Sequence, residues 1–86
     1  MEFEKGRSYE IRKYPGDKIF RGIYLGDVQR EHLFRTDSQD YAIVGDHEAE
    51  VVNGIISHKK HFSSSISIGS RNKLPERFSK LLEVKL

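Results

Sequence analysis

The sequence contains no cysteine, so it can form neither a disulfide framework nor a thiolate metal site. This composition permits a reducing compartment. It also lacks an apolar run long enough to span a membrane. The first residues, MEFEKGR, are charged from position 2 and show no signal-peptide core. We therefore expect a cytoplasmic protein with no membrane partner.

The usual signatures of catalysis are missing as well. No glycine-rich loop followed by lysine could cradle a phosphate, and no nucleophile elbow is present. We expect no enzyme activity, no catalytic residue and no cofactor. His58 and His61 have an H-x-x-H spacing, with Asp46 and His47 earlier, and imidazole with carboxylate suits zinc. The alternative is a solvated polar loop beside two lysines, and we expect no metal.

The length of 86 residues predicts one domain, residues 1–86, with a thin core. The net charge of +2 is spread unevenly. Residues 1–50 hold 8 Lys and Arg against 11 Asp and Glu, whereas residues 51–86 hold 7 against 2. A basic segment can bind a polyanion such as nucleic acid. It can equally be a solvated face, or meet the acidic half of another copy.

Alternating apolar residues and turn signals predict short strands over much of the chain, and Phe3 in the lead-in is a candidate to dock on the core. Turns are expected at residues 14–17 and 37–40. Asn53-Gly54 is a hairpin signal or a barrel corner within a β-branched run. Gly69 and Ser70 are expected to end the last strand. The predicted strands are residues 6–14, 18–28, 32–36, 41–44, 49–57 and 62–68.

The strand over residues 18–28 is apolar on both faces, as in a central or strongly bent strand. Gly22 and Gly26 lie on one face of it, where glycine marks a bend, a bulge or a close backbone approach. We predict a mostly β fold, a small barrel of five or six bent strands over about residues 6–69. The alternative is a curved hairpin in an α+β domain.

The last segment changes its period. An apolar stripe at helical spacing, with Pro75 in the first turn, predicts a helix over about residues 75–84. So short a helix is unstable alone, so it must pack on the barrel, cap one end of it or dock on a partner. The stripe consists of Leu74, Phe78, Leu81 and Leu82.

The stretch from 18 to 44 resembles the first motif of Sm-like RNA-binding proteins, which are small barrels of the SH3-like kind. Gly22, Tyr24 and Gly26 match the glycine-containing strand, and Asp27 lies one residue earlier than expected. Leu33 matches the apolar step, whereas His32 stands where the family has its base-contacting Asn.

The second Sm motif resembles residues 52–54, with Asn53 in place of its Arg. Members of the family usually begin with a helix, whereas this chain is expected to end with one. The resemblance implies a barrel that binds RNA and closes rings through its edge strands.

We therefore predict a non-enzymatic binding module with single-stranded RNA as the first candidate ligand. Aromatic side chains such as Tyr24 and Phe34 would stack on bases if exposed, and otherwise belong to the core. The alternative is a protein-interaction or assembly module, a homo-oligomer formed at the edge strand 62–68 or a complex formed through the C-terminal helix. The candidate nucleic-acid-binding residues are His32, Asn53, Lys59, Lys60, Arg71 and Lys73.

Overall fold

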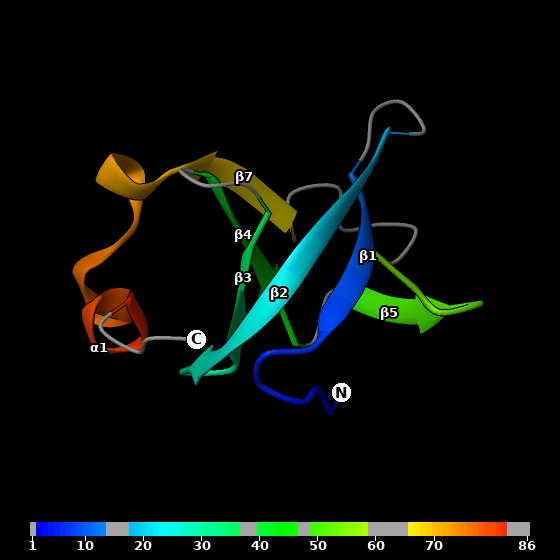
Figure 1. The fold of residues 1–86 in the computed structure, drawn as a ribbon, viewed down its shortest axis with the longest axis horizontal. Coiled ribbons are helices and arrows are strands. Elements are labelled where there is room, and N and C mark those ends of the chain that lie inside the picture. The colour runs from blue at the N-terminus through cyan, green and yellow to red at the C-terminus, as the bar shows by residue number, and fades with distance from the viewer. Residues whose placement is uncertain (1, 14–17, 37–39, 47–48, 59–65, 83–86) are drawn as a thin grey trace.

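The computed structural model describes residues 2–13, 18–36, 40–46, 49–58 and 66–82. Their strands form one sheet in the order β5-β6-β1-β2-β3-β4-β7, curled into a half-barrel with a short helical segment at one end (Figure 1). The strand pairs of this sheet are antiparallel except for β6 with β1. The strands are β1 (Ser8–Lys13), β2 (Lys18–Val28), β3 (Glu31–Arg35), β4 (Asp40–Gly45), β5 (Ala49–Val52), β6 (Ile55–His58) and β7 (Ile66–Ser70).

The mostly β, bent-strand fold is confirmed, with seven described strands where five or six were expected. The additional strand arises at Asn53 and Gly54, which have φ values of +54° and +78° and turn the chain between β5 and β6. Left-handed backbone at both central positions is the conformation of a tight two-residue hairpin. The β-branched run is therefore two paired strands.

The last strand extends further than expected, because Gly69 and Ser70 pair with Tyr41 and Asp40 of β4. The turn expected at 14–17, residues 37–39 of the turn expected at 37–40, and the first residues of the strand predicted over 62–68 lie outside the described residues, whereas Asp40 begins β4. No helix of the described chain is both long and apolar enough to cross a membrane.

The predicted C-terminal helix is present but shorter. It consists of a 3₁₀ turn, η2 (Glu76–Phe78), that runs into α1 (Ser79–Leu82), after a separate 3₁₀ turn η1 (Arg71–Lys73). Pro75 has extended backbone (ψ 148°) and caps η2, so the helix begins one residue later than expected. Residues 83 and 84 lie outside the described part of the chain.

The sheet is apolar on both faces, because neighbouring residues of one strand point to opposite sides. Tyr24 and Phe34 belong to one core and their neighbours Leu25 and Leu33 to another. The first core lies with Ile11, Val44, Ile56 and Ile66 inside the curl. The second lies under Phe78 of the C-terminal segment. This division explains why β2 is apolar on both sides.

Two glycines of β2 permit this geometry. A Cβ atom on Gly22 would lie 2.8 Å from Cβ of Phe34, so β1, β2 and β3 can pack as they do only around glycine here. Gly26 has a φ of +138°, and the β2–β3 register shifts between Tyr24 and Gly26. Such a bulge bends the strand. The expectation that these glycines mark a bend and a close approach is confirmed.

Candidate functional site

The β2–β3 hairpin positions His32, one of the predicted site residues. Gln29 and Arg30 both have positive φ, +51° and +65°, and connect Val28 directly to Glu31. The amide of Asp46, just after β4, donates to the carbonyl of Arg30 at 2.9 Å. This bond holds the end of β4 beside the start of β3.

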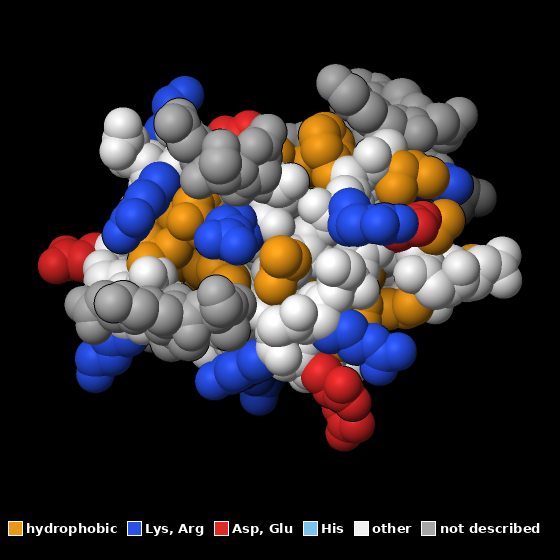
Figure 2. Space-filling model, in the orientation of Figure 1, with side chains coloured by type: hydrophobic (Ala, Val, Ile, Leu, Met, Phe, Trp, Pro, Cys, Tyr) orange, Lys and Arg blue, Asp and Glu red, His pale blue; other side chains and the backbone are white. Residues whose placement is uncertain are grey.

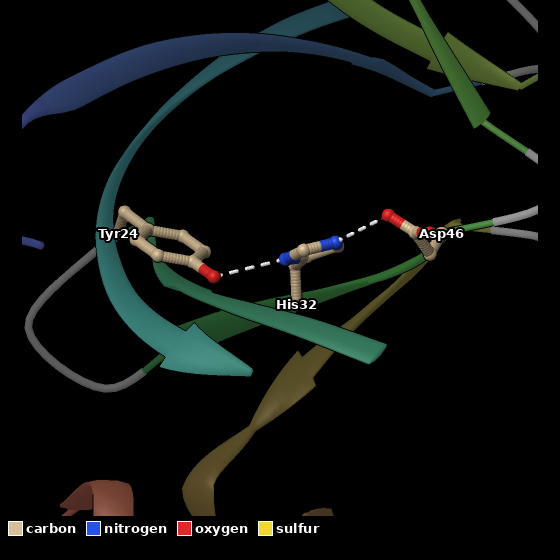
Figure 3. Close-up of polar contacts among 3 residues, drawn as sticks. All are labelled: Tyr24, His32 and Asp46. Atoms are coloured by element: carbon tan, nitrogen blue, oxygen red, sulfur yellow. Dashed lines mark hydrogen bonds and ion pairs between the residues drawn. The ribbon is translucent and has the colours of Figure 1, made fainter. Parts of the chain in front are cut away.

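A line of hydrogen bonds runs through His32 (Figure 3). The hydroxyl of Tyr24 lies 2.9 Å from Nδ1 of His32, and Nε2 of His32 lies 2.8 Å from Oδ1 of Asp46. An ionised carboxylate can only accept, so Nε2 carries the proton and donates to Asp46. Nδ1 of the neutral ring then accepts from the Tyr24 hydroxyl. The residues come from β2, β3 and the loop after β4.

A hydroxyl, an imidazole and a carboxylate in line have the order of a nucleophile, its base and the group that orients the base. The electrostatics oppose that use. Burial, assisted by the nearby Asp27 and Asp46 charges, raises the pKa of Tyr24 to about 12. The hydrogen bond from His32 lowers the pKa of Asp46. The network therefore favours a neutral hydroxyl and a charged carboxylate, which satisfies buried polar groups and does not activate the phenol.

The structure leaves no exposed aromatic surface at the predicted base-stacking positions. Phe34 is fully buried, Tyr24 is 5% exposed and His32 is 6% exposed. Tyr24 and Phe34 thus follow the alternative that assigned them to the core. His32 has both ring nitrogens engaged, so in this structure it offers neither of them to a base.

Asn53, the other position that the Sm-like resemblance marks as base-contacting, lies at the exposed tip of the β5–β6 hairpin. Asn tolerates the left-handed backbone of this turn better than most residues, so the turn alone explains it. Asn53 and Tyr9 line a hollow of about 600 Å³. His32 lines a different hollow of about 670 Å³.

The second hollow has an acidic character. Among the described residues, its lining includes the carboxylates Glu2, Glu4 and Asp27 and one Lys or Arg side chain, Arg7. Arg7 is already 3.7 Å from the carboxylate of Glu4. An excess of carboxylates repels a polyanion, so this hollow does not suit a phosphate backbone.

The basic candidates lie elsewhere. Arg71 and Lys73 are exposed on η1, beyond the end of β7 and on the opposite side of the view from the β5–β6 hairpin (Figure 1). Figure 2 shows Lys and Arg side chains over this part of the face. Lys59 and Lys60 lie outside the described residues. The structure therefore does not bring His32, Asn53 and the η1 cations together.

Among the described residues, no three His, Asp or Glu side chains are grouped so as to hold a metal ion. His47 and His61 lie outside those residues, and nothing is described of the His58 side chain. The spacing of these histidines therefore stays a sequence-level observation.

Sequence reasoning missed the Tyr24–His32–Asp46 network. The available signal was the hairpin pairing: β3 and β4 place His32 opposite Val44, two residues before Asp46. Strand periodicity alone does not show that a loop carboxylate returns to a buried ring.

Comparison of the chain with models of protein families, with curated proteins and with solved structures found no match.

Proposed function

We propose that the protein is a non-enzymatic interaction module that assembles with further copies of itself through the open edges of its sheet. The observation that supports this is the outermost described strand, β5, where Val51 is 49% exposed and Val52 is 50% exposed. Figure 1 shows this hairpin reaching away from the body of the sheet. An edge strand with exposed apolar side chains is a template for another strand.

The partner we propose is a second copy of the chain, because the two outermost strands of the described sheet, β5 and β7, can pair with each other between copies. β5 lies at one end of the described strand order and β7 at the other, so β5 of one copy can pair with β7 of the next. Ser67 of β7 is exposed, as Val51 and Val52 of β5 are. Covering the exposed halves of Val51 and Val52 would contribute about 1 kcal/mol each, in addition to main-chain hydrogen bonds.

The test is sedimentation velocity over a range of micromolar concentrations. The wild-type chain should form a dimer or larger species, and Val51→Lys should shift it toward the monomer because edge lysine opposes strand pairing. Ile19→Lys is the control for adding a charge at an exposed apolar side chain, since Ile19 is 44% exposed but lies on β2, where it pairs with Arg12 of β1. A wild-type monomer at high concentration would refute the proposal.

Ser67→Lys distinguishes between two ways in which the copies could pair. If β5 pairs with β7, it should split the assembly as Val51→Lys does. If β5 instead pairs with β5 of the second copy, Ser67→Lys should leave the mass unchanged. Ile66→Pro would not test the contact between copies, because Ile66 is buried and pairs with Val44 within one chain, so the substitution would also disturb the monomer.

RNA binding is the second candidate. Two observations support it. The cationic side chains Arg71, Lys73 and Lys80 are exposed on the C-terminal segment, and the sequence resembles Sm-like proteins. Affinity for single-stranded RNA should then fall steeply with salt, since each neutralised phosphate releases a counterion. Changing Arg71 and Lys73 to Glu should weaken binding to all sequences and flatten that slope, and the same holds for Lys59 and Lys60. Absence of binding at low salt would dismiss this candidate and leave the assembly proposal intact.

A further inference from the structure

The N-terminal segment, residues 2–7, places one aromatic ring in a pocket of other rings. The ring of Phe3 lies 4.9 Å from Tyr9, 5.2 Å from Tyr24, 5.1 Å from His32 and 5.3 Å from Phe34, between ring centroids. Three of these contacts are edge-to-face, an arrangement that aromatic pairs prefer. Phe3 is half-buried, whereas the other side chains of residues 2–7 are exposed.

Hydrogen bonds join the described part of this segment to the sheet. The amide of Gly6 donates to the carbonyl of Tyr24 at 2.9 Å, and the amide of Tyr24 donates to Arg7 at 3.0 Å. The amide of Glu4 donates to the Tyr9 hydroxyl at 2.8 Å. The Glu4–Arg7 ion pair is exposed and contributes little. Residues 2–7 thus contact the sheet as a bound peptide would, through one half-buried aromatic ring and a short stretch of main-chain pairing.

The two hollows of about 600 and 670 Å³ lie on either side of this segment. Four residues line both of them: Glu2, Phe3, Arg7 and Tyr9. Three of the four belong to the N-terminal segment, so the segment is the partition. Its departure would join the hollows into one groove, from the β5–β6 hairpin past Tyr9 to Tyr24 and His32.

We propose that the aromatic pocket, formed by Tyr9, Tyr24, His32 and Phe34, is a recognition site for an extended protein segment with an aromatic anchor, and that Phe3 occupies this site in cis. The chemistry of the partner follows from the present occupant. A partner Phe or Tyr takes the place of Phe3 among the four rings. The four rings of the pocket come from β1, β2 and β3, whereas the proposed self-assembly uses β5 and β7; Val51 of β5 lines only the neighbouring hollow of about 600 Å³.

The test is a titration of the full-length Phe3→Ala protein with the peptide MEFEKGR, followed by NMR of the amides and side chains. The peptide should shift the signals of Tyr9, Tyr24 and His32. The same peptide carrying Phe3→Ala should not, and it is the matched control. Wild-type protein should bind MEFEKGR with an affinity at least about tenfold lower than the variant, because Phe3 fills its pocket for most of the time.

Three results would overturn the proposal. The first is a folded Phe3→Ala protein that does not bind MEFEKGR at millimolar concentration. The second is equal affinity of the variant and the wild type for this peptide. The third is a wild-type dimer that Phe3→Ala splits, which would make the second copy's Phe3 the occupant. Each result leaves the edge-strand proposal to be decided by Val51→Lys.

A measurement on the wild type decides the case if Phe3→Ala does not fold. The amides of Gly6 and Tyr24 are the donors that tie the segment to β2. In hydrogen exchange they should open at least about tenfold more often than the amides of the β3–β4 ladder, because the segment leaves without global unfolding. Equal protection of both sets would show that Phe3 is a permanent part of the core and would overturn the proposal.

Discussion

Phe78→Ala tests whether the C-terminal segment is part of the folded domain. Phe78 has no exposed surface and packs with Leu25, Leu33 and Tyr41 in the core outside the curl. Truncation of a fully buried Phe costs about 3–5 kcal/mol, from lost burial and from the cavity left behind. A domain has only about 5–15 kcal/mol of stability in total. The free energy of unfolding should fall by about a fifth or more, and the melting temperature by about 12 °C or more.

The assay is urea and thermal unfolding followed by circular dichroism, since the chain has no tryptophan. Phe78→Leu is the control, because it keeps most of the apolar volume and should cost less than about 1.5 kcal/mol. An unchanged melting curve for Phe78→Ala would refute the reasoning and make the segment a free tail. A cooperative loss confined to the helical signal would show that the segment undocks alone.

Other predictions concern β2 and the buried network. Gly22→Ala should destabilise the fold by about 1–3 kcal/mol in urea unfolding, because its methyl group would lie against Cβ of Phe34; no loss would show that the strands can separate freely. The raised pKa of Tyr24, about 12 against 10.0, stabilises the fold fully below pH 10, and this contribution of about 2–3 kcal/mol is lost as pH rises through 12. Tyr24→Phe should remove that alkaline slope, and an unchanged slope would contradict the assignment. The lowered pKa of Asp46 contributes stability that is present above its usual value of 3.8 and lost as pH falls through the lower folded value. Asp46→Asn should flatten this acid limb of the unfolding curve, whereas a limb identical to wild type would place the acid sensitivity elsewhere.

Much of the fold could be predicted from local patterns. The limits of β2 agree with the prediction because alternation and glycine mark both its ends and its bend. Asn53-Gly54 predicted the hairpin between β5 and β6, and the apolar stripe that includes Phe78 predicted the buried face of the helix. These signals depend on residues close in sequence, where backbone preference and periodicity decide the structure.

The arrangement of strands and the buried network could not be predicted in this way. Periodicity shows which residues form a strand but not which strand lies beside it, so the placement of β6 next to β1 was not foreseen. The burial of His32 depends on Asp46, which reaches it only through the hydrogen bond to Arg30 and the β3–β4 register. Phe3 was a candidate for the core from its type alone, whereas the four rings around it come from three strands.

β6 joins β1 through the pairs Glu10–Ile55 and Ile11–Ile56, whereas β1, β2 and β3 each pair with the next strand along the chain. Contacts between distant residues require the closure of a long loop, so they form late in folding. We expect the four-stranded meander β1–β4 to form first, and β6 and β7 to dock on its two sides afterwards. During that interval β1 and β4 are the unprotected strands of a nascent sheet. The yield of refolding should therefore fall as protein concentration rises, because these two strands can pair with other chains before β6 and β7 cover them.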